Sequence, residues 1–122
     1  MKTDIMMMLM SDTYKHTHPR MYPQNLTKLV SYLTPRKNMS EAFPNMVFFG
    51  LQAFIQEYLI DGFNKQFFDR PLEFIEDEYK HYMDIQIGVK NTEWDKIKAL
   101  HELGYLPLEI RALPEGTVVN IW

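Results

Sequence analysis

The stretch Thr92-Glu93-Trp94-Asp95-Lys96-Ile97-Lys98-Ala99-Leu100-His101-Glu102-Leu103-Gly104 carries the clearest structural signal in this chain of 122 residues. Its first four residues have the spacing of a capping box, with Asp95 in place of the usual glutamate, and Gly104 is suited to end a helix. The apolar positions recur at helical spacing: Trp94, Ile97, Leu100 and Leu103. We therefore predict a helix that follows Asn91 and packs this stripe against a core.

Two apolar runs on the amino-terminal side of this stretch also predict helices. Met46–Ile60 is densely apolar and is predicted as a buried helix that closes near Gly62. The next helix is expected after Asp69-Arg70-Pro71, because Pro71 suits a first helical turn and Asp69 can cap it. The residues expected on its inner face are Phe74, Ile75, Tyr79, Tyr82 and Met83.

Three segments with alternating or β-branched residues predict strands near 26–35, 106–113 and 117–121. The first is stopped by Thr34-Pro35 and presents Arg36 and Lys37 at its far end. The other two strands flank the tight turn Pro114-Glu115-Gly116. The whole chain, residues 1–122, is thus predicted to be a single α+β domain with about three helices packed on a few strands. Because such a small sheet leaves apolar edges, we expect self-association through that edge or an exposed face.

The composition excludes several classes of protein. Hydrophobic residues make up 46% of the chain and aromatic residues 14%, which is too apolar for general disorder. The absence of cysteine excludes a disulfide framework and thiolate sites, and it fits a cytoplasmic setting. The apolar run Ile5–Met10 is too short to span a membrane and is expected to face the core.

The charge is unevenly distributed along the chain. The net charge of −3 argues against nonspecific nucleic-acid binding, yet residues 1–38 hold six lysine and arginine residues against two aspartates. This imbalance indicates that the amino-terminal third faces an anion.

The segment Asp12–Pro23, within this basic amino-terminal third, is rich in side chains that can contact a ligand. It combines a carboxylate, two tyrosines and four basic or imidazole groups within twelve residues. Such a composition is typical either of an anion or nucleotide contact or of a capped, aromatic-rich turn. His16 and His18 lack the spacing and partners of a zinc site, and no metal site is predicted. The chain also has no glycine-rich phosphate loop and no nucleophile elbow.

The order of residues in this segment is informative as well. Asp12-x-Tyr14-Lys15-x-Thr17-His18-x-x-x-Tyr22-Pro23 resembles the beginning of nicotinamide phosphoribosyltransferases. Three further blocks resemble the same family in the same order: Asn25-x-x-Lys28 leading to Ser31-Tyr32 and Arg36, Val47–Gln52 with Tyr58-Leu59, and Leu106–Gly116. The resemblance covers nearly the whole chain.

The resemblance implies both an activity and a set of site residues. Members of the family transfer a phosphoribosyl group from phosphoribosyl pyrophosphate to nicotinamide, with magnesium, in NAD salvage. Tyr14 resembles the tyrosine that stacks on the nicotinamide ring in the site of the partner subunit. Asp12 and Arg36 resemble residues that line this shared site, and Arg36 matches a phosphate-contacting arginine. For Lys15 and His18, ligand contact and local structural bonding both remain open.

The resemblance also implies what this chain lacks. The family's enzymes are several times longer, and their catalytic barrel would follow residue 122. We therefore expect an amino-terminal domain that contributes no catalytic residue and is inactive alone. The alternatives are a noncatalytic interaction or regulatory module, which pairs with a full-length or split phosphoribosyltransferase, and an unrelated small anion-binding domain.

Overall fold

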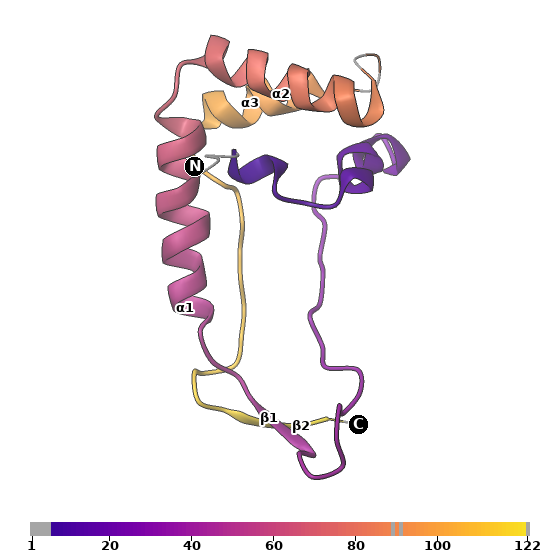
Figure 1. Ribbon diagram of the computed structural model, residues 1–122, viewed down its shortest axis with the longest axis vertical. Coiled ribbons are helices and arrows are strands. Elements are labelled where there is room, and N and C mark those ends of the chain that lie inside the picture. The colour runs from indigo at the N-terminus through magenta and orange to yellow at the C-terminus, as the bar shows by residue number, and fades with distance from the viewer. Residues whose placement is uncertain (1–5, 89, 91, 122) are drawn as a thin grey trace.

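Helix α2, Leu72–Ile87, supplies the centre of the core. Ile75, Tyr79 and Met83 recur every four residues and so share one face of the helix, where each is no more than 1% exposed. The other buried side chains come from the amino-terminal segment and from the helix before α2: Met6, Leu9 and Phe67. Helix α3, Trp94–Leu103, lies alongside α2 and closes this core (Figure 1).

The computed structural model describes residues 6–88, 90 and 92–121. The core helices form one end of the molecule and a two-stranded antiparallel sheet forms the other. One long helical rod and two extended segments connect the two ends (Figure 1). This arrangement confirms the predicted α+β class.

Helix α3 is the predicted helix, but it does not begin in a capping box. Its N-cap residue is Glu93 rather than Thr92, and no side chain makes a cap hydrogen bond; Asn91, which the predicted helix follows, lies outside the described residues. Instead, the backbone N–H of Glu93 donates a hydrogen bond to the Tyr79 hydroxyl at 3.1 Å. Gly104 ends the helix as predicted, with a φ of 78° that favours glycine. Of the apolar stripe, Leu103 is exposed while the other three residues pack against the core.

Helix α2 differs from its prediction in two details. Its N-cap is Pro71, without a side-chain cap hydrogen bond, so the predicted cap by Asp69 is wrong. Phe74 is exposed rather than on the inner face, and the Arg70 guanidinium lies 4.8 Å from the centre of its ring. A cation over an aromatic face accounts for a large apolar ring at the surface.

The helical rod consists of α1, Leu51–Phe54, and two π-helical segments, η3 (Ile55–Gly62) and η4 (Asn64–Phe68). The predicted closure near Gly62 is therefore wrong. A side chain at Gly62 would place its Cβ 3.0 Å from Cε of Met7. The glycine serves close packing against the amino-terminal segment, and the helix continues past it.

The start of the rod is fixed by a residue from the other end of the chain. The Glu115 carboxylate accepts hydrogen bonds from the N–H groups of Gly50 and Gln52, at 2.6 and 3.2 Å. These bonds, above all the one from Gly50, lower the pKa of Glu115 below its usual value. An anion at a helix start is also favoured by the helix dipole. This contact joins the sequence block Val47–Gln52 to the block Leu106–Gly116.

The rod is not the buried helix that its composition predicts. Phe49, just before it, is 82% exposed, and Phe54 and Tyr58 are also exposed. An apolar pocket of about 410 Å³ lies between the rod and the segment 104–110. Among the described residues only Phe67 of the rod is buried, because the core touches the rod at its carboxyl end.

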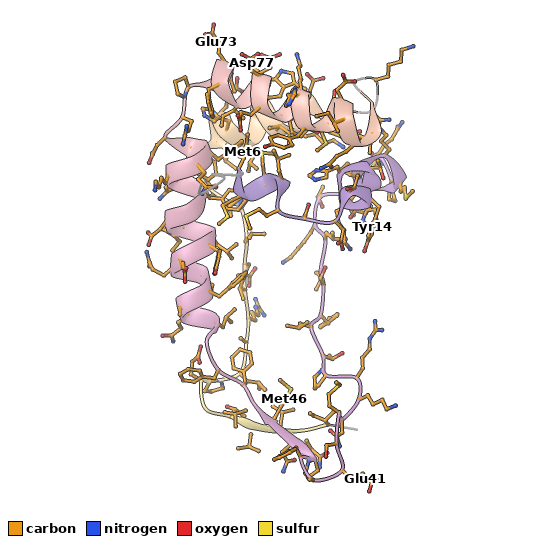
Figure 2. The ribbon with its side chains drawn as sticks, in the orientation of Figure 1. Met6, Tyr14, Glu41, Met46, Glu73 and Asp77 are labelled. Carbon is orange, nitrogen blue, oxygen red and sulfur yellow. The ribbon has the colours of Figure 1, made fainter. Side chains whose placement is uncertain are left out.

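The sheet pairs segments that are distant in the sequence. Strand β1, Asn45–Val47, runs antiparallel to β2, Val118–Asn120, with Met46 opposite Val119. The strand predicted at 117–121 is confirmed. Strand β1 overlaps the start of the helix predicted over Met46–Ile60, and Figure 2 places Met46 in this sheet.

The strands predicted at 26–35 and 106–113 are wrong for the part of the chain that the structure describes. Both segments are extended but have no strand partner there. An ion pair joins them, with Nζ of Lys28 3.6 Å from Oε2 of Glu109. Alternation predicts a half-buried surface, and a strand forms only where a neighbouring backbone completes the hydrogen-bond ladder.

The methionine-rich amino terminus faces the core in part, as predicted, although Met10 at the end of the run is 62% exposed. It forms the short 3-10 helix η1, Met7–Leu9, with Met6 and Leu9 buried. Ile5, the first residue of the predicted run, lies outside the described residues. No helix in residues 6–88, 90 and 92–121 has the length and apolar character needed to cross a membrane.

We predict that Ile75→Ala lowers the free energy of unfolding by about 2–5 kcal/mol, because it leaves a cavity at a fully buried position. Ile85 lies on the same helix but is 71% exposed, so Ile85→Ala should cost no more than about 0.5 kcal/mol. Urea unfolding followed by circular dichroism measures both values. Equal losses in the two variants would show that the core is not centred on this face of α2.

Candidate functional site

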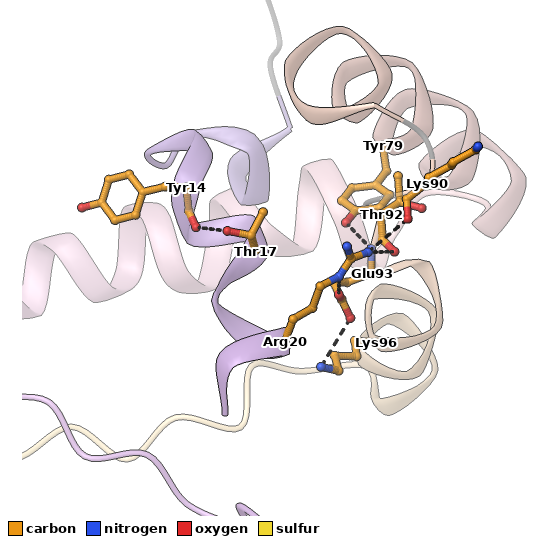
Figure 3. Close-up of polar contacts among 8 residues, drawn as sticks. All are labelled: Tyr14, Thr17, Arg20, Tyr79, Lys90, Thr92, Glu93 and Lys96. Atoms are coloured by element: carbon orange, nitrogen blue, oxygen red, sulfur yellow. Dashed lines mark hydrogen bonds and ion pairs between the residues drawn. The ribbon is translucent and has the colours of Figure 1, made fainter. Parts of the chain in front are cut away.

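The segment Asp12–Pro23 folds mainly as the 3-10 helix η2, Thr13–Met21. Asp12 is its N-cap residue, and the Asp12 carbonyl accepts the N–H of Lys15 at 2.9 Å. The Thr17 hydroxyl donates to the Tyr14 carbonyl, also at 2.9 Å (Figure 3). No residue of η2 is buried, so the helix lies on the surface of the domain.

The ring of Tyr14 is the most prominent feature of this surface helix. It is 56% exposed and points away from the body of the domain (Figures 2 and 3). The ammonium group of Lys15 lies 4.9 Å from its ring centre, and the His18 ring centroid lies at 5.3 Å. An exposed aromatic face with basic groups beside it can stack on a flat ring and attract an anionic group attached to that ring.

The structure places the three predicted site residues in two locations. Asp12 and Tyr14 lie together at the start of η2, and both are exposed. Arg36 is exposed on the extended segment that leads from η2 to the two-stranded sheet (Figure 1). Within the described residues, no hydrogen bond or ion pair joins Arg36 to either of the others. The chain by itself therefore brings Asp12 and Tyr14 together and leaves Arg36 apart.

Arg20 has a different environment from the other basic groups of the segment. Its Nε donates to Oε1 of Glu93 at 2.5 Å, and its Nη2 donates to the carbonyls of Lys90 and Thr92 at 3.3 and 3.5 Å (Figure 3). We call these four residues the Arg20 network. The guanidinium is thus bound by groups of the domain itself, which distinguishes Arg20 from the other cations of the segment.

The electrostatics of the Arg20 network centre on Glu93. Its side chain is only 16% exposed, and the hydrogen bond from Arg20 lowers its pKa below the usual value. Nζ of Lys96 also lies 3.4 Å from Oε2 of Glu93. Burial raises the pKa of Tyr79, whose hydroxyl receives the Glu93 N–H. Glu93 is therefore a charged residue held between two cations and the core.

Two of the histidines, His16 and His101, have hydrogen-bonding partners within the domain. Nε2 of His16 lies 3.2 Å from the Ser11 hydroxyl, and burial lowers the pKa of His16. His101 packs edge-on against Phe67 and places Nε2 2.8 Å from the Arg70 carbonyl. Across the described ranges, no three histidine or acidic side chains gather in a way that could hold a metal ion.

The chain also resembles a known protein family over most of its length. The model of the family described as nicotinamide phosphoribosyltransferase, N-terminal domain, matches residues 6–110. The chain belongs to the nicotinamide phosphoribosyltransferase family. Asp12, Tyr14 and Arg36 all lie in the matched region of this family's N-terminal domain.

A curated relative supports the assignment to the nicotinamide phosphoribosyltransferases. The chain is 44% identical over 115 residues to the nicotinamide phosphoribosyltransferase of Acinetobacter baylyi. The match covers 90% of this chain but 23% of that relative, so the chain spans less than a quarter of its length. No solved structure gave a significant match.

We predict that Glu93→Gln lowers the free energy of unfolding at neutral pH by about 1 kcal/mol, because it removes a charge-assisted pair that is partly exposed. The folded-state pKa of Glu93 lies below the ordinary value of 4.5. The contribution is therefore complete above that pH and is lost as the pH falls through the folded-state pKa. Urea unfolding at neutral pH and at about pH 3 measures the difference between the two proteins.

Glu102→Gln is the matched control, since Glu102 is exposed on the same helix and lies 3.9 Å from Lys98. It should change stability by no more than about 0.5 kcal/mol at either pH. If Glu93→Gln destabilised the protein equally at both pH values, the ion pair would not be the source of the effect.

Proposed function

We propose that this chain is the amino-terminal domain of an enzyme that forms nicotinamide mononucleotide from nicotinamide and phosphoribosyl pyrophosphate. In this proposal Asp12, Tyr14 and Arg36 contribute to a site shared between two subunits. The observation that carries the proposal is the exposed ring of Tyr14, which lies beside two basic groups in a domain of this family. The cytoplasmic setting expected from the sequence belongs to the same proposal.

Each of the three residues has a side chain suited to bind one part of the substrates. The ring of Tyr14 stacks on the pyridine ring of nicotinamide, which is flat and aromatic. Arg36 pairs with phosphate oxygens through its planar guanidinium. Asp12 is exposed and makes no side-chain hydrogen bond or ion pair within the described residues, and in this proposal its carboxylate accepts a hydrogen bond from the ligand. These groups bind and orient the substrates.

Magnesium belongs to the complete enzyme in this proposal. The side chains described here do not fit a metal site of their own, because no three carboxylate or imidazole groups gather among them. We therefore assign no step to a metal held by this chain. Magnesium would bind together with phosphoribosyl pyrophosphate and neutralise the departing pyrophosphate.

The location of Arg36 supports a shared site. Arg36 and Tyr14 lie on different segments, and in this proposal further structure or another subunit brings them to one ligand. The segment that carries Arg36 also exposes apolar side chains, including Leu33, which is 100% exposed. Exposed apolar residues on an extended segment favour association, and we propose that the domain pairs with a second copy or with the catalytic part.

We predict that Tyr14→Ala lowers kcat/KM for nicotinamide by about 10- to 100-fold, because stacking on an aromatic side chain contributes about 1–3 kcal/mol per base. The assay uses a chimeric enzyme in which this chain replaces the matched segment of the Acinetobacter baylyi relative. Tyr14→Phe keeps the ring and should retain most activity. Tyr105 has a similar exposure, so Tyr105→Ala serves as a control that leaves kcat/KM nearly unchanged. Unchanged activity in Tyr14→Ala would make Tyr14 a surface residue without a site role.

We also predict that the isolated chain forms no nicotinamide mononucleotide and that adding the remainder of the relative as a separate polypeptide restores turnover. Product formation is measured by chromatography, with each part alone as the control. Robust turnover by the isolated chain would contradict the proposal.

The alternative, a noncatalytic regulatory module, is favoured by the exposed apolar segments. It would change the rate of a full-length enzyme without completing a split one.

A further inference from the structure

We propose that Arg20 is a positioning residue, which fixes the place of Tyr14 by anchoring helix η2 to the start of helix α3. The inference rests on the proposed role of Tyr14 in ligand binding. It assigns a function to a basic residue of the Asp12–Pro23 segment that binds no ligand itself.

The first argument is that packing holds η2 only loosely. No residue of the helix is fully buried, and residues 16–19 are half-buried. The other side-chain hydrogen bonds of η2 are local, from Thr17 to the Tyr14 carbonyl and between His16 and Ser11. In the part of the chain that the structure describes, the hydrogen bonds that connect η2 to distant residues start from Arg20. Without them, a surface helix of nine residues would be held mainly by its two chain connections.

The second argument concerns what the anchor is attached to. Glu93 accepts the Arg20 Nε, and the backbone N–H of the same residue donates to the Tyr79 hydroxyl. The side chain of Tyr79 is 1% exposed, so it belongs to the rigid core. A continuous series of hydrogen bonds therefore runs from η2 through Glu93 to the core (Figure 3). Because Glu93 is bound to the buried Tyr79, its contact with Arg20 can hold η2 in one position, which a contact between two flexible surface side chains would not do.

The third argument is geometric. Tyr14 and Arg20 are six residues apart, about two turns of a 3-10 helix. In Figure 3 the Tyr14 ring extends away from the domain, while the Arg20 side chain reaches towards the start of α3. A tilt of η2 about its chain connections would therefore displace the ring of Tyr14. Stacking requires the ring at a defined place and angle, so ligand binding would sense the tilt.

The type of side chain matters as well. Arg20 donates to one carboxylate and two carbonyls from a single planar group. A lysine can pair with Glu93 but does not reproduce this fork. We therefore expect Arg20→Lys to retain part of the function and Arg20→Gln to retain little of it.

The test is a double-mutant cycle in the chimeric enzyme. Arg20→Gln should raise KM for nicotinamide by about 5- to 10-fold with a smaller change in kcat, and Arg20→Lys should lie between it and the unmodified enzyme. In a Tyr14→Ala background, Arg20→Gln should have little further effect, because the ring that it positions is gone. Ile75→Val is the control for stability alone, and it should lower the melting temperature without raising KM.

A second measurement covers the case in which a chimeric variant does not fold. In the isolated chain, Arg20→Gln should speed amide hydrogen exchange in residues 13–21, while exchange in the buried turns of α2 stays the same. Unchanged exchange in residues 13–21 would overturn the inference.

The outcomes separate this inference from the proposed function. If Tyr14→Ala raises KM and Arg20→Gln does not, the positioning role is wrong and the site role of Tyr14 stands. If the effects of the two substitutions are fully additive, Arg20 does not act through Tyr14, and the inference is again wrong. If Tyr14→Ala itself has no effect, the site role fails and the inference falls with it.

Discussion

The hydroxyl group of Tyr79 joins the core of this domain to its surface. The ring is buried on α2 and lies 6.2 Å from the Trp94 ring of α3, centre to centre. Its oxygen accepts the N–H of Glu93, just where α3 begins. Burial raises the pKa of Tyr79 further above its ordinary value of 10.0, because the apolar surroundings disfavour the charged phenolate. This hydrogen bond ties the start of α3 to the core, and the Glu93 side chain extends the connection to Arg20 of η2.

Local signals in the sequence predict the helices best. The buried positions Ile75, Tyr79 and Met83 of α2 and the glycine that ends α3 depend on neighbouring residues and are confirmed, although Phe74 of the same predicted face is exposed. The strands expected at 26–35 and 106–113 fail for a physical reason. The alternation of apolar and polar residues suits a strand with one face buried, but the described residues do not bury that face. They also provide no neighbouring backbone with which a strand could pair. The rod is expected to be buried because it is rich in apolar residues, but the described residues cover only its carboxyl end.

The candidate site is predictable only in part. The order of residues around Tyr14 points to the family, and the structure adds that this ring is exposed with Lys15 and His18 beside it. Arg20 cannot be separated from its basic neighbours by sequence, because its partner Glu93 lies 73 residues further along the chain. Nor does any local pattern reveal that Glu115 caps the rod at Gly50, 65 residues away. Interactions between distant residues define the environment of each charge.

The central claim is that the exposed ring of Tyr14 completes a nicotinamide site in an assembled enzyme. The most direct measurement is a crystal structure of the chimeric enzyme with nicotinamide bound. The account predicts that the Tyr14 ring lies in stacking contact with the pyridine ring, about 3.5–4.0 Å from it, with Arg20 still bound to Glu93. A structure with nicotinamide bound elsewhere and the Tyr14 ring in solvent would contradict the account.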